Sequence, residues 1–295
     1  MPNKKLKINF TDTWDACVQF FVDILSNRYN VEISKDAEYL LFCDENFGNT
    51  NTSYKKTDIT KIFYTGENCR PENYECHYAI THDHNFHPWH YRLPLYVADM
   101  WAIETFHKVK DRPFEYLFNF NKTYAKDKFE FCAFVHRNPG NPVRNNFFQK
   151  LSDRYKKVNS AGTLLNNTGI SLPDVESKIR YFTKHKFSLC FENSSYPGYV
   201  TEKILHGFYG NTIPIYWGSK TIVKDFNPGS FINYFDYENE DKLIDMIVRI
   251  DNDDNLYNQI VNTSKFMYNI PPDQVILTNF LNWFDSIVYN KRDSR

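Results

Sequence analysis

The chain of 295 residues is poor in glycine and has no long apolar run. Glycine occurs only 10 times, and the glycine signatures of dinucleotide-binding enzymes, P-loop NTPases and α/β-hydrolases are missing. No apolar window of about 18 residues is found, so no membrane-spanning helix is expected. The basic N-terminal segment is followed by no apolar stretch of signal-peptide length. These absences argue against a dehydrogenase, an NTPase or a hydrolase. They also predict a protein without a transmembrane segment.

An excess of either charge sign is also missing. The 35 Lys and Arg residues nearly balance the 36 Asp and Glu residues, and the formal net charge is -1. A protein that wraps nucleic acid needs a basic excess on one face to neutralise phosphates. We therefore expect no nucleic-acid partner, and we expect any anionic ligand to be small and locally bound.

The 6 cysteines are scattered along the chain. Cys43, Cys132 and Cys190 each lie within an apolar run, where a free thiol behaves as a small core residue. This pattern predicts a reduced, cytoplasmic protein. Peripheral association with a membrane surface is left open.

Aromatic residues, in contrast, are abundant and make up 18% of the chain. A compositional bias toward Asn, Lys, Tyr and Phe explains much of this excess, and most of the rings are expected in the core. Tyr199, Trp89 and Phe86 are candidates for stacking on sugar or base faces.

Short apolar strands alternate with segments of helical spacing, which predicts an α/β fold with two blocks. The first block has strand patterns at 6–10, 39–43, 61–64 and 78–81 and a helical pattern at 14–26. The polar segment 107–128, broken by Pro113, is the expected linker. The second block begins at Phe129, and the chain is expected to be helical from Asp241 to its end. The expected domains are residues 1–120, residues 121–270 and a C-terminal helical segment, 271–295, that packs back on the first domain.

The densest group of candidate site residues directly follows the apolar strand pattern 187–191. Asn193, Tyr199, Glu202 and Lys203 lie in the loop and first helical turn after it. A helix N-terminus with an added lysine suits a diphosphate, and Glu202 can accept hydrogen bonds from sugar hydroxyls. The alternative is an ordinary helix start with a first-turn acid and a solvated lysine.

Two more candidates lie elsewhere. Arg144 starts a helical segment after a loop rich in Pro, Gly and Asn, where a guanidinium can clamp two phosphate oxygens. Glu67 ends a strand pattern just after Gly66 and can serve as a general base. A surface arginine and a solvated turn carboxylate are the alternatives for these two residues.

Two segments have weak metal-binding patterns. The segment 82–90 contains four of the 9 histidines, but it lacks a cysteine partner and the His-Glu-x-x-His signature. We expect an exposed loop with an aromatic rim there rather than a metal site. The acidic run 251–254 resembles the Asp-x-Asp of metal-dependent sugar transferases, but no apolar strand precedes it, and a solvated helix cap is expected. The sequence therefore predicts no bound metal.

The run FENSSYPGYVTEKILHGFYGNTIPIYWGS at 191–219 resembles the α1,3/4-fucosyltransferases of glycosyltransferase family 10, in particular their soluble bacterial branch. Other runs resemble the family in the same order and spacing: IFYTGEN at 62–68, YRLPLY at 91–96, CAFVHRNPGNPVRNNFF at 132–148, LLNNTG at 164–169 and VKDFNPGSFIN at 223–233. The resemblance thus extends over most of the chain.

The resemblance implies a GT-B architecture, with two Rossmann-like domains facing across a cleft. It implies an N-terminal domain for the acceptor and a C-terminal domain for GDP-fucose. The implied reaction is inverting transfer of L-fucose to a GlcNAc hydroxyl, usually O3, of a lactosamine-type glycan. The product would be an α1,3 or α1,4 linkage as in Lewis-type antigens. No cofactor and no metal would be required.

The same resemblance assigns roles to the candidate residues. By position, Glu67 looks like the general base, and Arg144 and Lys203 look like the diphosphate clamp. Asn193, Tyr199 and Glu202 look like further donor-binding residues.

Two departures limit the transfer of these properties. The His-rich segment 82–90 replaces a more acidic stretch of bacterial relatives, which leaves the acceptor contacts open. The chain stops at 290–295 without the heptad repeats and basic tail of some relatives, so oligomeric state and membrane association stay open. The alternatives are a GT-B transferase for another nucleotide sugar and an inactive carbohydrate-binding relative.

Overall fold

The computed structural model describes residues 4–44, 53–84, 87–104, 107–111 and 113–289 and contains two compact units. Unit 1 comprises Met1–Leu95 together with Pro272–Arg295, and unit 2 comprises Tyr96–Pro271. The division falls at Leu95 rather than at the expected boundary between residues 120 and 121, and the last helix groups with unit 1. Phe86 and the terminal residues 290–295 lie outside the described residues.

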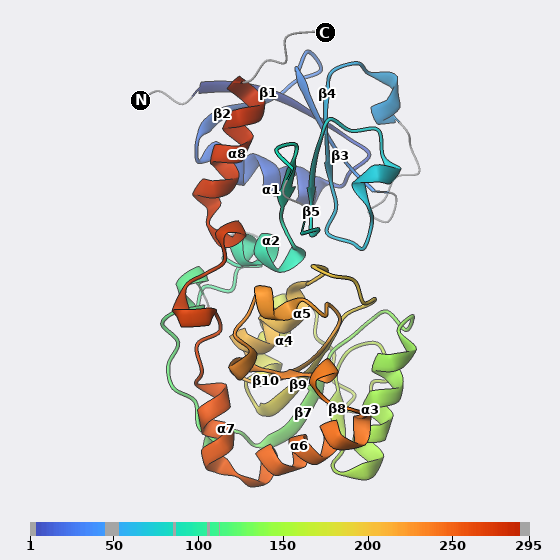
Figure 1. The fold of residues 1–295 in the computed structure, drawn as a ribbon, viewed down its shortest axis with the longest axis vertical. Helices are drawn as coiled ribbons and strands as arrows, with labels where there is room; N and C mark the ends of the chain where they lie inside the picture. The colour runs from blue at the N-terminus through green and yellow to red at the C-terminus, as the bar shows by residue number, and fades with distance from the viewer. Residues whose placement is uncertain (1–3, 45–52, 85–86, 105–106, 112, 290–295) are drawn as a thin grey trace. The chain divides into compact units, whose positions relative to one another are not determined.

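Unit 1 is built on a parallel six-stranded sheet with the order β2-β1-β3-β4-β5-β6 (Figure 1). Its elements are β1 (Lys4–Thr11), α1 (Asp15–Ser26), β2 (Tyr29–Ile33), β3 (Tyr39–Cys43), β4 (Thr60–Tyr64), β5 (Tyr78–Thr81), β6 (His90–Arg92) and α8 (Leu277–Tyr289). The expected strands are present. The strands β2 and β6 were not expected. The apolar residues Tyr29, Val31 and Ile33 do alternate with polar ones in β2, so this signal was available in the sequence, whereas β6 is only 3 residues long.

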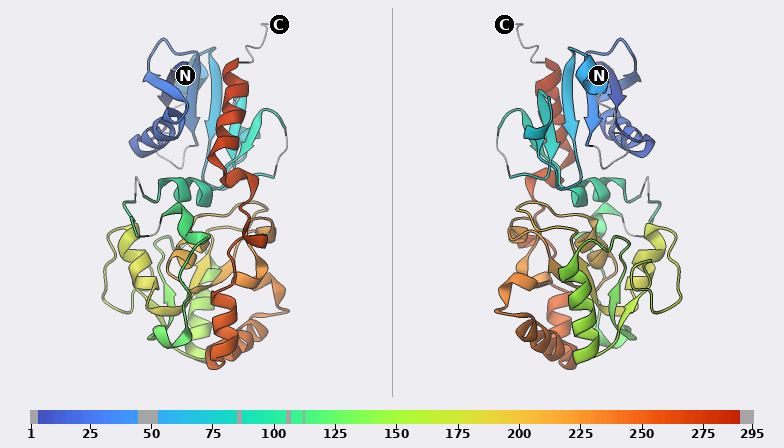
Figure 2. Two further views of the ribbon diagram at one scale, coloured as in Figure 1. Left: turned by 90° about the vertical axis from the view of Figure 1, so that its left-hand side faces the viewer. Right: turned by 90° about the vertical axis from the view of Figure 1, so that its right-hand side faces the viewer.

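Both ends of the chain contribute to the core of unit 1. The red helix α8 lies alongside the blue strands in both views of Figure 2. Its Phe284 ring lies 6.0 Å from the ring of Tyr29, and Phe21 of α1 lies 4.9 Å from Tyr64. The ring of Tyr54 stacks on the ring of Phe42 in β3, with the ring centres 4.1 Å apart. The aromatic residues therefore fill the space around this sheet.

Unit 2 contains a parallel five-stranded sheet with the order β11-β10-β9-β7-β8. Its main elements are α2 (Leu95–Ala102), β7 (Glu130–Phe134), α3 (Pro142–Arg154), β8 (Val158–Ser160), α4 (Val175–Phe182), β9 (His185–Phe191), α5 (Glu202–Tyr209), β10 (Ile213–Trp217), β11 (Ile232–Asn233), α6 (Glu240–Asn252) and α7 (Asp254–Val261). Each unit thus has the Rossmann-like α/β organisation that was expected, and the predicted fold class is confirmed.

Local signals in the sequence explain how two helices of unit 2 begin and pack. Helix α3 starts with Pro142, and the Asn141 side chain caps it by accepting the backbone N–H of Arg144 at 3.2 Å. On α5, a Cβ at Gly207 would lie 2.7 Å from Oγ of Ser188, so only glycine lets this helix approach β9 so closely.

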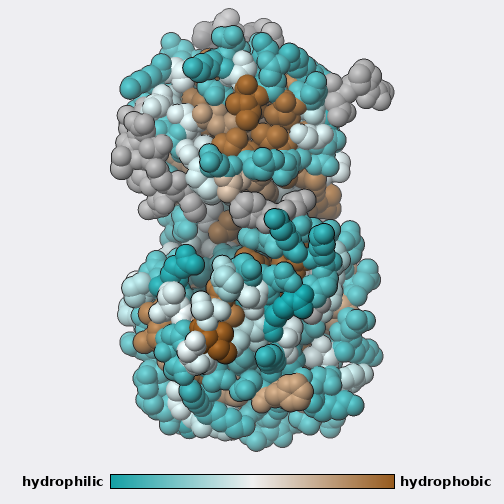
Figure 3. All heavy atoms as spheres, turned by 180° about the vertical axis from the view of Figure 1, so that it is seen from behind, coloured by the Kyte–Doolittle hydropathy of each residue, from teal (hydrophilic) through white to brown (hydrophobic). Residues whose placement is uncertain are grey.

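In the view of Figure 3 the surface of unit 2 is mainly hydrophilic, whereas unit 1 carries a hydrophobic area.

The segment 107–128 is not a free linker. Its described residues include the short 3-10 helices η4 (Phe114–Leu117) and η5 (Ala125–Asp127). The Asn262 side chain accepts the backbone N–H of Thr123 at 2.8 Å and donates to its carbonyl at 2.7 Å. These bonds fasten the segment to unit 2, although its polar composition predicted a linker.

The chain is expected to be helical from Asp241 to its end, and α6, α7 and α8 agree with this, but the stretch between α7 and α8 does not. Helix α7 ends at Val261 and α8 begins at Leu277, with only the short 3-10 helices η9 (Met267–Asn269) and η10 (Asp273–Val275) between them. No helix in the described part of the chain is long and apolar enough to cross a membrane.

Candidate active site

The order of the strands in unit 2 marks a ligand site. From β7 the chain passes through α3 to β8 on one side, whereas β9 lies on the other side of β7. In open parallel sheets, ligands bind outside the carboxyl ends of the strands at such a switch point. The loops after β7 and β9 lead to Arg144 on one side and to Asn193, Glu202 and Lys203 on the other. The topology thus places these four predicted residues at one end of one sheet.

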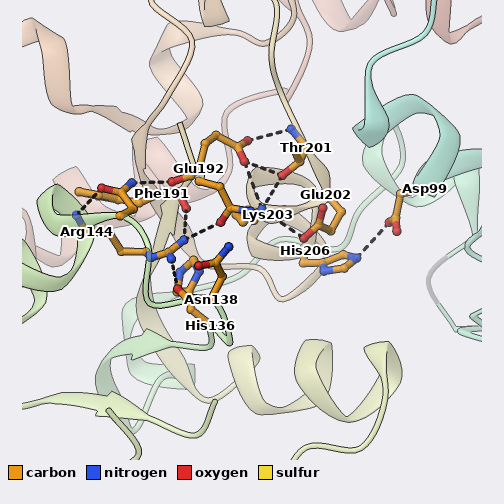
Figure 4. A network of polar contacts seen from close by, with 12 residues as sticks. Asp99, His136, Asn138, Arg144, Phe191, Glu192, Thr201, Glu202, Lys203 and His206 are labelled. Atoms are coloured by element: carbon orange, nitrogen blue, oxygen red, sulfur yellow. Dashed lines mark hydrogen bonds and ion pairs between the residues drawn. The ribbon is translucent and has the colours of Figure 1, made fainter. Parts of the chain in front are cut away.

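Arg144 is buried and holds two loops together. Only 1% of it is exposed. Its Nη1 donates to Oδ1 of Asn193 at 3.1 Å. Nη1 also donates to the carbonyl of Phe191 at 3.4 Å, and Nη2 donates to the carbonyl of Asn138 (Figure 4). Its Nε is buried and has no hydrogen-bond partner among the described residues. The surface-arginine alternative is excluded, and Arg144 and Asn193 lie in direct contact.

Lys203 lies in the first turn of α5, and three side-chain oxygen atoms surround its ammonium group. Its Nζ donates to Oγ1 of Thr201 at 2.9 Å and lies 3.3 Å from Oε2 of Glu192 and 3.5 Å from Oε1 of Glu202 (Figure 4). Burial alone would raise the pKa of Glu202, but Lys203 and Lys178 outweigh it and lower the pKa to about 2. Glu202 is therefore ionised at neutral pH, and Lys203 is paired rather than solvated.

Glu192 is a further buried carboxylate of this site, and it was not predicted from the sequence. It is fully buried, and its carboxylate accepts the backbone N–H of Thr201 at 2.8 Å and the Thr201 hydroxyl at 2.6 Å. Burial raises its pKa, an effect that Lys203 partly offsets. The available signal was an acidic residue directly after the apolar strand 187–191, at the carboxyl end of the strand. Position 218 must be glycine to leave room, because a Cβ there would lie 2.4 Å from Cγ of Glu192.

A second buried charge group lies one turn further along α5. Asp99 of α2 accepts hydrogen bonds through Oδ2 from Nε2 of His206 at 3.0 Å and through Oδ1 from Nε2 of His107 at 2.9 Å. Burial raises the pKa of Asp99, but His206 and His107 lower it well below its usual range. His206 follows Glu202 by four residues, so the two side chains share one face of the helix.

Tyr199 and Trp89 are not open stacking surfaces. Tyr199 is 1% exposed, so its ring packs inside unit 2. Trp89, in unit 1, is half-buried and stacks on His87 with ring centres 5.5 Å apart. A donor-binding role of Tyr199 stays a prediction and requires contact from within the packed loop.

Glu67 lies in unit 1, three residues past the end of β4, and is half-buried. The Thr65 hydroxyl accepts its backbone N–H at 3.0 Å and donates to Oδ2 of the buried Asp44 at 2.5 Å. Asp44 directly follows β3, the neighbouring strand. The carboxyl ends of two adjacent strands thus fix the backbone that carries Glu67.

The side chains of the two segments with weak metal-binding patterns take part in structural interactions. In the His-rich segment, His82 and His90 are buried instead of exposed, and Nε2 of His82 lies 2.5 Å from Nη2 of Arg70. Within the described residues, no group of three or more His, Cys, Asp or Glu side chains is arranged to hold a metal ion.

In the acidic run, Asp253 caps α7 by accepting the backbone N–H groups of Asn255 and Leu256 at 3.0 Å each, as expected of a helix cap. Asp251 is buried rather than solvated. It pairs with Lys156 at 2.6 Å and with Lys186 at 3.1 Å.

Comparison with known families identifies both units. Residues 7–99 match the Alpha-(1,3)-fucosyltransferase FucT N-terminal domain. Residues 124–273 match the Glycosyltransferase family 10 (fucosyltransferase) C-terminal domain.

Individual relatives agree with these families. The Alpha-(1,3)-fucosyltransferase FucT of Helicobacter pylori is 34% identical over 266 residues, which cover 79% of this chain and 53% of that protein. A putative fucosyltransferase of Acanthamoeba polyphaga mimivirus is 36% identical over 150 residues, 47% of this chain and 24% of that protein. The chain therefore spans about half the length, or less, of these curated relatives.

Solved structures give the same result. A crystal structure of an alpha1,3-fucosyltransferase matches with a TM-score of 0.81 and 27% identity, covering 98% of this chain and 91% of that one. A structure of alpha1,3-fucosyltransferase with GDP-fucose matches with a TM-score of 0.78 and 27% identity, covering 99% and 92%. The Anabaena protein HepE, solved with UDP and glucose, has a TM-score of 0.55 at 7% identity, covers 96% and 99%, and shows likeness of fold alone.

Proposed function

Because the chain belongs to glycosyltransferase family 10, we propose that it transfers L-fucose from GDP-fucose to a GlcNAc hydroxyl of a lactosamine-type glycan. The observation that carries the proposal is the placement of Arg144, Asn193, Glu202 and Lys203 at the switch point of the unit 2 sheet. An alpha1,3-fucosyltransferase of very similar structure has been solved with GDP-fucose. We expect the product linkage to be α1,3, with α1,4 as the other outcome.

Glu67 is proposed as the general base. It would take the proton of the acceptor hydroxyl while that oxygen attacks the anomeric carbon of fucose from the face opposite GDP. The bond between the anomeric carbon and the diphosphate oxygen breaks in the same step, which inverts the configuration. The fixed backbone at Thr65 and Asp44 supports this role, because a base must be held in register with the proton it removes.

Unit 2 is proposed to stabilise the leaving group. Negative charge grows on the diphosphate as the bond breaks, and Lys203 with the N-terminal N–H groups of α5 can stabilise it. Arg144 is buried with its Nη atoms already bonded, so it acts either by holding the loops or after its guanidinium turns toward the phosphates. Glu202 can accept hydrogen bonds from sugar hydroxyls of the donor. These groups supply the chemistry without a cofactor or metal.

A transfer assay tests the function. The purified chain is incubated with GDP-fucose and lactosamine, lactose or lacto-N-biose, with and without EDTA, and the product linkage is assigned by NMR. We expect transfer to O3 of GlcNAc that is unaffected by EDTA. Absence of transfer to every acceptor, or transfer only with added metal, would contradict the proposal.

The same assay separates the two alternatives. Transfer from another nucleotide sugar, with none from GDP-fucose, identifies a transferase of different donor specificity. Glycan binding without any transfer identifies an inactive relative. A cytoplasmic location, with or without attachment to the membrane surface, remains part of the proposal and is tested by cell fractionation.

A further inference from the structure

The Glu192 carboxylate lies where the two halves of the proposed diphosphate site meet. Through its side chain it contacts Thr201 and Lys203 at the start of α5. Through its backbone carbonyl it accepts a hydrogen bond at 2.6 Å from Nδ2 of Asn141, the cap of the helix that carries Arg144. One buried residue therefore links the loop of each candidate phosphate-binding cation.

The charge of Lys203 is already balanced in the structure described here. Two carboxylates, Glu192 and Glu202, lie within 3.5 Å of its Nζ. Lys178 also acts on Glu202, and Arg144 faces Glu192, while Asp99 adds a third carboxylate to the group. A diphosphate that arrives at Lys203 therefore adds negative charge to a cluster whose charges are already matched. Like charges at such distances repel strongly when they are shielded from water. Protonation of one of these carboxylates would remove part of this repulsion.

We propose that Glu192 is the internal counter-ion of Lys203 and a positioning residue of the donor site, and that its carboxylate takes up a proton when the donor diphosphate takes over the charge of Lys203. The proton comes from solvent, and the carboxylate becomes a neutral acid that remains hydrogen-bonded to Thr201. No covalent bond changes other than the new O–H bond. This inference rests on the proposed function, because it assumes that the diphosphate binds at Lys203.

The surroundings of Glu192 identify it as the carboxylate that takes up the proton. The ionisable groups that face it are Glu202 and Lys203 of α5, Arg144 of α3, Tyr216 of β10 and Cys190 of β9. Burial favours its neutral form and Lys203 opposes this, so engagement of Lys203 by phosphate removes the main stabilisation of the charged form. Glu202 differs, because its pKa is lowered to about 2 by Lys203, Lys178 and His206 together.

Calorimetric titration of the whole chain with GDP-fucose, without acceptor, tests the inference. GDP-fucose is the right probe because its phosphates have no ionisation near neutral pH, whereas the terminal phosphate of GDP, with a second pKa of about 6, would itself exchange protons. Titrations in several buffers of different ionisation enthalpy give the number of protons taken up. We expect net proton uptake and, at full linkage, an affinity that weakens by about tenfold per unit rise in pH.

Two variants complete the test. In Glu192→Gln the proton uptake is expected to disappear and the affinity to become nearly independent of pH. The matched control is Glu176→Gln, which changes a glutamate on the surface of the same unit and should retain the behaviour of the unmodified chain. If Glu192→Gln does not fold, infrared difference spectroscopy on the unmodified chain provides the second measurement, because ligand binding must convert a carboxylate band into a protonated carboxyl band.

The outcomes separate the two proposals. Binding of GDP-fucose with no proton uptake, with uptake that persists in Glu192→Gln, or with no protonated carboxyl band overturns the role of Glu192 and leaves the proposed function in place. Failure of the unmodified chain to bind GDP-fucose at all overturns both.

Discussion

The hydroxyl oxygen of Thr65 accepts the backbone N–H of Glu67 at 3.0 Å, and the same hydroxyl donates to the buried Asp44. A threonine side chain that bonds the backbone two residues on closes a small turn and restricts its geometry. The proposed base therefore projects from a turn that is fixed on one side by a buried carboxylate. Catalysis by Glu67 should depend on this turn as well as on Glu67 itself.

Thr65→Val tests the turn. Valine keeps the shape but cannot bond either partner, so we expect kcat to fall by about tenfold or more, in the range of a misplaced general base. The affinity for GDP-fucose should not change, because the donor residues lie in unit 2. Thr65→Ser retains a hydroxyl and should restore most of the activity. Equal loss in both variants would show that the turn is not what positions Glu67.

Glu67→Gln tests the base directly. The amide keeps the size of the side chain but cannot accept the proton, so transfer should fall by about 100-fold to 10,000-fold. Binding of GDP, followed by calorimetry, should remain nearly intact. A comparable loss of GDP affinity would place Glu67 in donor binding instead of base catalysis.

Lys203→Ala is expected to differ from Glu67→Gln in its effect on donor binding. Both transfer and GDP binding should be lost, because the ammonium group is proposed to contact the diphosphate in the ground state and in the transition state. The control is Lys220→Ala, which changes an exposed lysine of the same unit. Unchanged GDP affinity in Lys203→Ala would contradict a diphosphate contact.

The buried Asp99 should contribute to the acid dependence of unit 2, together with Glu202 and Asp251, whose pKa values are also lowered. The pKa of Asp99 is lowered in the folded chain. The ionised side chain therefore stabilises the folded state fully above the pKa of the unfolded chain, about 3.9, and this stabilisation is lost progressively as pH falls below that value. We expect Asp99→Asn to reduce the free energy of unfolding by about 3 kcal/mol at pH 6, as when a partner is removed from a buried pair.

The difference between Asp99→Asn and the unmodified chain should shrink as pH falls toward 3. Chemical denaturation at several pH values measures this difference, and Asp245→Asn, an exposed carboxylate, is the control. His107 adds a trend of opposite sign. Burial lowers the pKa of His107 but Asp99 outweighs it and raises the folded pKa, so the contribution of His107 is full below about pH 6.5 and is lost as pH rises through the folded value. A difference that does not vary with pH would show that Asp99 is not the titrating group.

Sequence patterns were sufficient for the fold class and for most of the candidate site. The strand β9 and the first turn of α5 are coded locally, by an apolar run and by a helix start that directly follows the loop. The residues of this loop and turn therefore lay in predictable positions at the carboxyl end of a strand. Arg144 was found in the same way, from the Asn-Pro start of α3.

Burial and pairing could not be derived in this way, because they depend on residues far apart in the chain. Asp99 and His206 are separated by 107 positions, and neither has a local pattern that marks it as part of a pair. The segment 107–128 looked like a linker because many of its polar groups find their partners far away in the chain, for example in Asn258 of α7, in Asn262 and in Asn211.

The sequence by itself determined the parallel α/β organisation, the residues at the ends of β7 and β9, and their likeness to one enzyme family. Only the tertiary structure decided that Arg144 is enclosed, that Lys203 is already paired and that Glu192 is the buried partner. The physical reason is that periodicity and helix signals act over a few residues, whereas the protonation and availability of a charged group are set by every element that excludes water from it.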